Sequence, residues 1–274
     1  MKGLIIVRKI RSFLCIVKMS FMHRLIYRSS MFISLATNAI YMFMTYFLWR
    51  AIFDSTPDGI INGMTFKDTF IYLALSACIG SSIVSFLEWN MSGDVKSGDI
   101  AVWFIKPISY PQYMCSRSFG NISANFIMTF IPTFIFVFFL TKGYIDIGIN
   151  IIMFVIAFFI AVPISMMFDF LIGILSFSTE NVWGISTMKD SIVLLLAGAI
   201  VPLVFFPEPI RKVVEWLPFQ TIYNLPLQIL INKNYEFKDY IGQILIQLIW
   251  LAVLFIISTL CYRKAARRMI VNGG

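Results

Sequence analysis

One stretch of the chain combines the glycines, charges and hydroxyl groups that could hold a phosphate: "SGDVKSGDIAVWFIKPISYP", residues 92–111. Gly93 and Gly98 have the spacing of the two glycines of a P-loop, whose backbone N–H groups surround nucleotide phosphates. A P-loop also needs Lys and then Ser or Thr directly after its second glycine, but here Asp99 and Ile100 follow. An aspartate at that place repels a triphosphate, and no strand precedes the stretch. We therefore expect no nucleotide site in this chain.

The same stretch has the composition of a contact segment. Its charged first part, residues 94–99, leads into the apolar "IAVWFIKPIS", in which Pro107 ends any helix. Such a segment suits a short helix that lies at the membrane surface and offers charged side chains to a soluble partner. An ordinary solvated loop is the alternative interpretation.

Asp169 is the second group that could do chemistry, because it lies within a long apolar run. A carboxylate in the middle of a membrane costs about 3 kcal/mol on insertion scales. Asp169 either lines a substrate path or is a structural, hydrogen-bonding acid near the interface. A proton relay is not expected, since we identify no partner acid or histidine for it within the spans. The single His23 and the four cysteines lack the spacing of metal ligands, so we predict neither a metal site nor a disulfide.

The elements that carry these residues are membrane helices. Of the 274 residues 59% are hydrophobic and 13% are charged, which excludes the usual composition of a soluble domain. The long uncharged apolar runs favour helices over the short alternating strands of a barrel. We predict an all-α polytopic membrane protein, a single transmembrane domain over 1–274. Its six predicted spans cover residues 31–53, 70–87, 122–140, 149–177, 185–206 and 240–262.

The basic residues predict the orientation of the chain. They gather before residue 30 and in the tail "YRKAARRMIVNGG", and basic residues beside spans are typical of cytoplasmic segments. The net charge of +8 therefore indicates topology rather than nucleic-acid binding. Residues 1–28 have apolar side chains at helical spacing and basic ones on another side, which predicts an amphipathic helix along the cytoplasmic membrane face. Both termini are expected in the cytoplasm.

Residues 198–226, "GAIVPLVFFPEPIRKVVEWLPFQTIYNLP", contain five prolines and lie at the outer end of the predicted fifth span and in the loop beyond it. Irregular backbone at membrane depth persists only where protein or water satisfies it. "IRKVVEWL" has apolar residues at helical spacing and predicts a short helix that re-enters the outer leaflet. A surface helix on a long loop is the alternative. The external re-entrant element and its loop are placed at 207–238, with Pro207, Pro209, Glu215, Trp216 and Pro218 as its marker residues.

Three pieces of the chain together resemble the permease subunit of a type-2 ABC exporter, the ABC-2 family, in its branch of short six-span permeases. They are the loop "GDVKSGDIAVWFIKPIS", the run "GAIVPLVFFPEPIRKVVEWLPF" and the basic tail "AARRMIVNGG". The resemblance implies a cytoplasmic coupling loop, residues 88–120, seated on a separate ATPase subunit. The residues expected to make that contact are Asp94, Lys96, Ser97, Gly98, Asp99, Trp103, Phe104 and Lys106.

The resemblance also implies the partners. ATP and Mg would be bound by the ATPase subunit, and this chain would hold no cofactor and no catalytic group. A second permease, identical or related, would complete the path, in contact with membrane lipid and without nucleic acid. The expected place is the plasma membrane of a bacterium. The exported substrate, whether a drug or antibiotic, a peptide, a lipid or a glycan, is left open. Two other functions stay open: an ATP-independent channel or secondary carrier, and an accessory membrane scaffold subunit.

Overall fold

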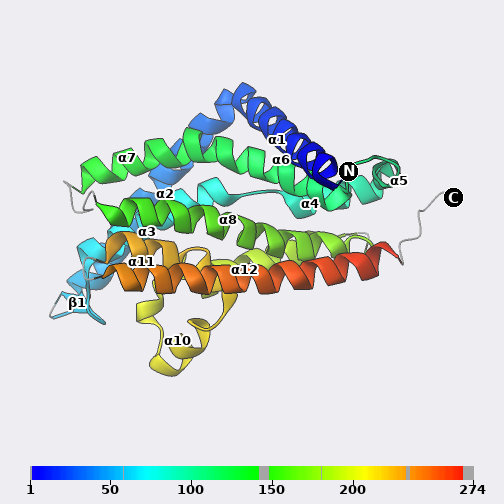
Figure 1. Cartoon of the computed structure of the whole chain (residues 1–274). Coiled ribbons are helices and arrows are strands. Elements are labelled where there is room, and N and C mark those ends of the chain that lie inside the picture. Colours follow the sequence, from blue (N-terminus) through cyan, green and yellow to red (C-terminus); the bar gives the residue numbers. More distant parts are fainter. Residues whose placement is uncertain (1, 58, 142–147, 180, 233–234, 268–274) are drawn as a thin grey trace.

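The computed structural model describes residues 2–57, 59–141, 148–179, 181–232 and 235–267. Helices account for most of this part of the chain, and most of them run along one long axis (Figure 1). The sheet found in the described residues is a small antiparallel hairpin of β1 (Ile60–Ile61) and β2 (Met64–Thr65). The all-α prediction is confirmed.

Five stretches of the described chain are long and apolar enough to cross a membrane. They are Ser29–Asp54, Phe66–Lys96, Tyr110–Leu140, Ile149–Leu175 and Phe237–Ala266. In the same order, they correspond to α2 (Arg28–Asp54); α3 (Phe66–Ile83) with α4 (Leu87–Lys96); α6 (Tyr110–Asn125), η1 (Phe126–Phe130) and α7 (Ile131–Leu140); α8 (Ile149–Leu175); and α12 (Phe237–Ala266). The multi-pass prediction is confirmed, and five of the six predicted spans correspond to these stretches over most of their length.

The predicted second span, residues 70–87, is interrupted near its end. α3 begins with a capping box, in which the Thr65 hydroxyl accepts from the N–H of Asp68 and the Asp68 carboxylate accepts from the N–H of Thr65. Residues 84–86 are not helical, and Phe86 has a φ of 51°, a left-handed conformation that is unfavourable for a residue with a large side chain. α4 begins directly after this break. We call residues 84–86 the inner break.

The third stretch is one long helix with a wider turn in its middle. η1 is a π-helix, and Pro132 lies in the first turn of α7 that follows it. Proline lacks an N–H and clashes with the carbonyl one turn before it, and a widened turn relieves both problems. The wider turn stacks Phe126 on Phe130 at 4.8 Å between ring centroids, and both rings contact Phe158 of α8. An aromatic layer therefore joins this helix to α8.

The predicted fifth span, residues 185–206, is wrong as a single continuous helix. α9 (Trp183–Leu196) has 14 residues and ends before Gly198, whose φ is 74°. The chain then leaves the bundle through the 3₁₀-helix η2 (Leu203–Phe205), the α-helix α10 (Glu208–Val214) and a second 3₁₀-helix, η3 (Pro218–Thr221). It returns so that the N–H of Asn224 donates to the carbonyl of Ala197 at 3.1 Å. We call this excursion, residues 198–223, the outer break.

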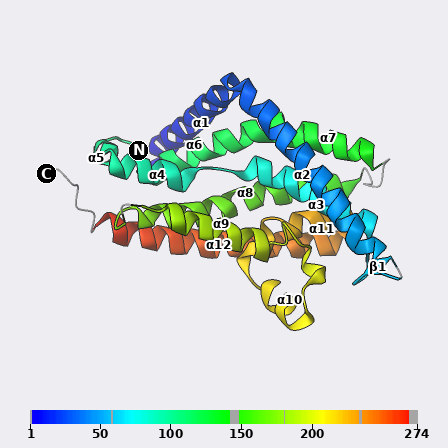
Figure 2. The same ribbon diagram turned by 180° about the vertical axis from the view of Figure 1, so that it is seen from behind.

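A helix of eight residues, α11 (Asn224–Ile231), continues the crossing where α9 leaves it. Figure 2 shows α9 and α11 following one another along the bundle. Together their residues extend about 33 Å at 1.5 Å per residue, enough for a hydrocarbon core of about 30 Å. The crossing is therefore composite. It places the start of α1 and the end of α12 at one end of the molecule, as an even number of crossings requires (Figure 1).

The first helix, α1 (Lys2–Ile26), packs closely on α6. A Cβ added to Gly120 of α6 would lie 2.5 Å from the carbonyl oxygen of Val17 and 2.8 Å from the Cβ of Ser20, so only glycine allows this approach. Arg24 donates through Nε to Asn125 Oδ1 at 3.0 Å. The amphipathic helix predicted for 1–28 is thus present as a helix that bends into α2 at Tyr27. Its position on the membrane face remains a prediction.

Candidate coupling segment and ionic cluster

The predicted coupling loop, 88–120, is built from helices: α4, the short α5 (Asp99–Phe104) and the start of α6. Gly93 lies inside α4, and Gly98 precedes α5 with a φ of 77°. The two glycines therefore belong to a helix and a turn, and they do not form one phosphate-binding loop. Figures 1 and 2 place α5 at the end of the molecule where α1 starts and α12 ends.

The charged residues of this segment face different ways. Asp94 is half-buried and accepts a hydrogen bond at 2.9 Å from the hydroxyl of Tyr110 in α6, which turns it toward the chain's own helices. Lys96, Ser97 and Asp99 are exposed, and the Ser97 hydroxyl donates to the Asp99 carboxylate at 2.7 Å. The exposed group is thus available to a partner, whereas Asp94 is occupied within the chain.

An aromatic stack fixes α5 on α6. The ring of Trp103 stacks on Tyr113 with centroids 3.7 Å apart, and the ammonium group of Lys106 lies 3.5 Å from the centroid of the Trp103 ring. A lysine over an indole is a favourable cation–π contact. The side chain of Phe104 lies outside the described part of the chain. α5 is therefore held against α6 by its own side chains.

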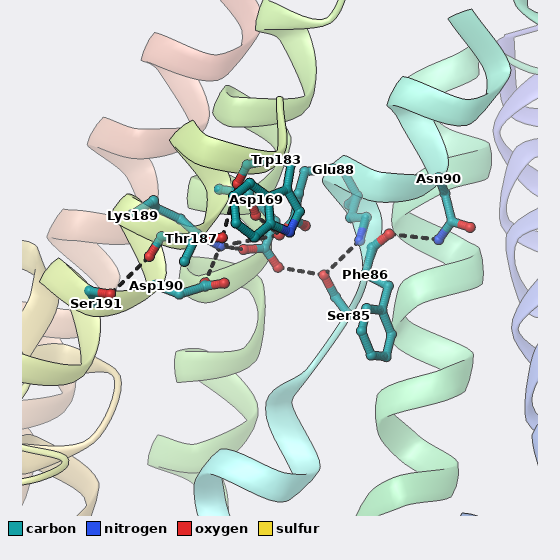
Figure 3. A network of polar contacts seen from close by, with 12 residues as sticks. Ser85, Phe86, Glu88, Asn90, Asp169, Trp183, Thr187, Lys189, Asp190 and Ser191 are labelled. Atoms are coloured by element: carbon teal, nitrogen blue, oxygen red, sulfur yellow. Dashed lines mark hydrogen bonds and ion pairs between the residues drawn. The ribbon is translucent and has the colours of Figure 1, made fainter. Parts of the chain in front are cut away.

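Asp169 of α8 belongs to a cluster of charged side chains just beyond the inner break. Lys189 of α9 places its Nζ 2.5 Å from Asp169 Oδ1, 2.7 Å from Asp190 Oδ1 and 3.4 Å from Oε1 of Glu88 in α4 (Figure 3). Glu88 and Asp169 are 4% and 7% exposed, so their charges are largely removed from solvent. We call Glu88, Asp169, Lys189 and Asp190 the ionic cluster.

Two serines complete the contacts of the cluster. Ser186 of α9 donates to Glu88 Oε1 at 2.8 Å. Ser85, in the inner break, donates to Asp169 Oδ2 and accepts from the N–H of Leu87 at 3.2 Å (Figure 3). Ser85 thereby satisfies a backbone N–H at the start of α4 while it holds Asp169. The conformation of the break depends in this way on a side chain from α8.

The charges of the cluster do not balance. Lys189 faces the two buried carboxylates, while Asp190 is largely exposed, and Glu88 Oε2 is buried without a hydrogen-bond partner. Ligand oxygens of Glu88, Asp169 and Asp190 lie within 4.8 Å of one another, as in a set of cation ligands. In this structure the ammonium group of Lys189 bonds to all three carboxylates. The absence of a metal site was predicted from the spacing of histidine and cysteine alone, and it stays a prediction.

A cavity of about 350 Å³ lies beside the cluster. All four residues of the ionic cluster line it together with Ser165, and most of its remaining lining is apolar, from α3, the inner break, α9 and residues 222–223. Asp169 thus faces a space of the size of a small ligand. Whether this space belongs to a substrate path remains a proposal.

The sequence-based description of Asp169 as lacking an ionisable partner was wrong. Lys189 and Asp190 lie inside the predicted fifth span, and Glu88 directly follows the predicted second one. The signal that could have found them is "MKD", residues 188–190, because a lysine and an aspartate within an apolar run are as costly as Asp169 itself. Opposite charges in two spans could have been matched as a pair.

The middle of the outer break, which contains α10, stands away from the bundle (Figures 1 and 2). α10 carries two ion pairs on its surface, Lys212 with Glu208 and Arg211 with Glu215. Of the predicted marker residues, Pro207, Pro209, Glu215 and Trp216 are exposed, with Trp216 81% exposed, whereas Pro218 is buried. Residues 218–231 of the predicted external loop are not a loop, since η3 and α11 pack into the core.

These features define an all-α, multi-pass membrane protein with a surface-exposed helical segment at one end and a protruding helix toward the other. Residues 39–273 match the model of the ABC-2 family transporter proteins, and the chain belongs to that family. The resemblance drawn from the sequence is confirmed. Searches of curated proteins and of solved structures each gave no match.

Proposed function

We propose that the chain is the transmembrane permease subunit of an ABC exporter and that its α4–α5 segment couples it to a separate ATPase subunit. ATP and Mg are bound and hydrolysed by that partner, and this chain supplies no catalytic group. The observation that carries the proposal is the construction of the segment. It exposes Lys96, Ser97 and Asp99 at one end of the molecule while aromatic stacking holds it rigidly on α6.

The connections of α4 support a mechanical role. A Cβ on Gly173 of α8 would lie 2.5 Å from Met91 Sδ, so α4 and α8 are in close contact. The ionic cluster further joins α4 to α8 and α9 through Glu88. A displacement of α5 would thus be passed to two crossings, and nucleotide state would shift the balance between two arrangements of the permease.

A second permease, identical or related, is the proposed partner within the membrane. α10 supports this, because Ile210, Val213 and Trp216 are exposed apolar side chains on an element that stands outside the bundle. The cavity beside Asp169 is the proposed part of the path in this chain. The membrane is proposed to be a bacterial plasma membrane with both termini in the cytoplasm, as the basic ends predict.

The test uses the permease reconstituted with the ATPase subunit that co-purifies with it. The variant Lys96→Glu with Asp99→Arg reverses two exposed charges and leaves Asp94 and Tyr110 in contact. We expect ATP hydrolysis to continue while export falls about tenfold or more, since each lost charge-assisted contact is worth about 1.5 to 3 kcal/mol. Lys238→Glu, an exposed charge at the opposite end, is the matched control. Unchanged export in the first variant would overturn the coupling assignment.

The ionic cluster favours a second candidate, an ATP-independent secondary carrier, because buried carboxylates with an uneven charge can take up a proton or cation. Vesicles that contain this chain without any ATPase distinguish the two. Substrate movement driven by a pH gradient in such vesicles would support the carrier. Movement that requires both the ATPase subunit and ATP would support the exporter.

A further inference from the structure

A second and larger cavity, of about 840 Å³, lies on the other side of the inner break. α1 and the bend at Tyr27 form one wall, α6 forms another, and the inner break with the start of α4 closes the third. Val84, Phe86 and Trp89 line both this cavity and the one beside Asp169. We call it the α1–α6 cavity.

The polar lining of the α1–α6 cavity is basic and rich in donors. Arg24 and Arg117 contribute two guanidinium groups, His23 an imidazole and Asn121 an amide. No acidic side chain is among the residues that line the cavity in the described part of the chain. Arg24 uses its Nε for Asn125, and its remaining nitrogens are the fork that matches a phosphate or carboxylate. The cavity therefore suits a ligand with a phosphate group.

The mouth of the cavity is apolar, which indicates what else the ligand carries. Met19, Phe86 and Trp89 line it and are 61%, 56% and 40% exposed. Phe32 and Ile33, shortly after the bend, are each 67% exposed at the start of an apolar membrane helix. The bend at Tyr27 thus marks the level where the chain enters the membrane, and lipid headgroups occupy that level. Aromatic side chains such as Trp89 are typical of it.

We propose that the α1–α6 cavity binds the headgroup of an anionic phospholipid, with its phosphate between Arg24 and Arg117 and its acyl chains leaving past Phe86 and Trp89. A free phosphate would satisfy the arginines equally well but would leave the apolar mouth without a partner. A lipid with a neutral headgroup carries a cation of its own, which the basic lining disfavours. This site is independent of the coupling proposal above.

Occupation of the cavity has a consequence for the inner break. The bound headgroup would connect α1 and α6 to Phe86 and Trp89, which are also the wall of the cavity beside the ionic cluster. A lipid in this place would hold the break in one conformation. The composition of the membrane would then influence how easily α4 moves.

Quenching of Trp89 fluorescence by brominated lipids tests the proposal. The full chain is placed in vesicles of phosphatidylcholine that contain either brominated phosphatidylglycerol or brominated phosphatidylcholine at equal mole fraction. We expect stronger quenching by the anionic lipid, and we expect Trp89→Phe to remove the difference. The variant Arg24→Gln with Arg117→Gln should weaken the preference for the anionic lipid about tenfold or more, because each charge-assisted bond is worth about 1.5 to 3 kcal/mol. Arg50→Gln, at an exposed arginine paired with Asp54, is the matched control and should keep the preference.

Three results would overturn the proposal. They are equal quenching of the unmodified chain by the two lipids, an unchanged preference in the double arginine variant, and a difference that survives in Trp89→Phe. Glycerol phosphate added to the solution tests whether the site binds a free phosphate. If low millimolar glycerol phosphate abolishes the difference in quenching between the two lipids, the site belongs to a soluble ligand instead. The unfolding midpoint in pure phosphatidylcholine shows whether the double variant is folded. If it is not, the comparison of the unmodified chain with Trp89→Phe still decides.

Discussion

The inner and outer breaks interrupt two membrane crossings in opposite ways. At the inner break three residues separate α3 from α4, and a charged group from another helix, Asp169, holds Ser85 in place. At the outer break 27 residues separate α9 from α11, and neutral groups close the gap. Here Asn224 donates to the carbonyl of Ala197, Ser76 to that of Ala199 and Gln247 to that of Thr221.

Both breaks satisfy the backbone groups that a membrane would leave unpaired, but they differ in what can change them. The hydrogen bonds at the outer break depend on shape, so they persist as long as the helices stay packed. The inner break depends on the charge balance of the ionic cluster, which a proton, a cation or a movement of α4 can alter. We infer that the outer break is structural and that the inner break is the movable one. Four substitutions test this difference.

The largest effect is expected from Lys189→Met. This variant leaves Glu88 and Asp169 buried without a cation, and removal of one partner of a buried ion pair costs about 3 to 5 kcal/mol. Denaturant unfolding in detergent micelles would measure the lost free energy of unfolding. Adding Asp169→Asn should recover much of it, because fewer buried charges then remain. Lys212→Met, at an exposed pair on α10, should cost less than about 1 kcal/mol. Equal stability of Lys189→Met and the unmodified chain would show that the cluster does not hold the inner break.

Gln247→Leu should have an intermediate effect at the outer break. Gln247 is fully buried in α12 and donates to the carbonyls of Ala157 and Thr221, so leucine leaves both acceptors without this donor. The expected loss is about 1 to 3 kcal/mol in the same unfolding assay, independent of pH between 5 and 8 because no charge is involved. Thr259→Val, an exposed change on the same helix, is the control and should stay within about 0.5 kcal/mol. A loss that varied with pH would remove the contrast between the two breaks.

The smallest effects should come from the residues with positive φ at the two breaks. Gly198→Ala at the outer break adds a Cβ 2.9 Å from the hydroxyl oxygen of Tyr72, in a conformation that costs a non-glycine residue about 1 to 2 kcal/mol. Phe86→Gly at the inner break relieves such a conformation but loses the contacts of the ring, so we expect a change below about 1 kcal/mol. Hydrogen exchange of α4 amides should become faster in Phe86→Gly, and unchanged exchange would contradict a movable inner break.

The sequence was sufficient for the long helices, because their signal is local. A run of about 20 apolar residues crosses a membrane whatever its neighbours are, and the spans beginning near residues 31, 149 and 240 needed nothing more. The helical nature of the segment between Pro209 and Pro218 was also visible from spacing, and α10 covers its first half. Fold class could thus be predicted, whereas the family was predicted from the resemblance of three motifs.

The breaks could not be predicted, because their causes lie far away in the chain. "SIVSF" contains neither glycine nor proline, and its conformation depends on Ser85 meeting Asp169, 84 residues later. The residues of α11 were assigned to the external loop, 207–238, and the bond of Asn224 to Ala197 makes them part of a crossing. Asp94 is a similar case. Its charge predicted an outward contact, and Tyr110 turns it inward.

The composite crossing has a consequence for how the protein enters the membrane during synthesis. α9 has 14 residues and carries Lys189 and Asp190, so as an isolated segment it is too short to span and too polar to partition into lipid. The partner of Lys189 in α8, Asp169, is made before it, whereas α11 and α12 are made after it. α9 can therefore enter stably only together with its neighbours. We expect the translocation machinery to retain the segment from α8 to α12 until it releases them as one unit.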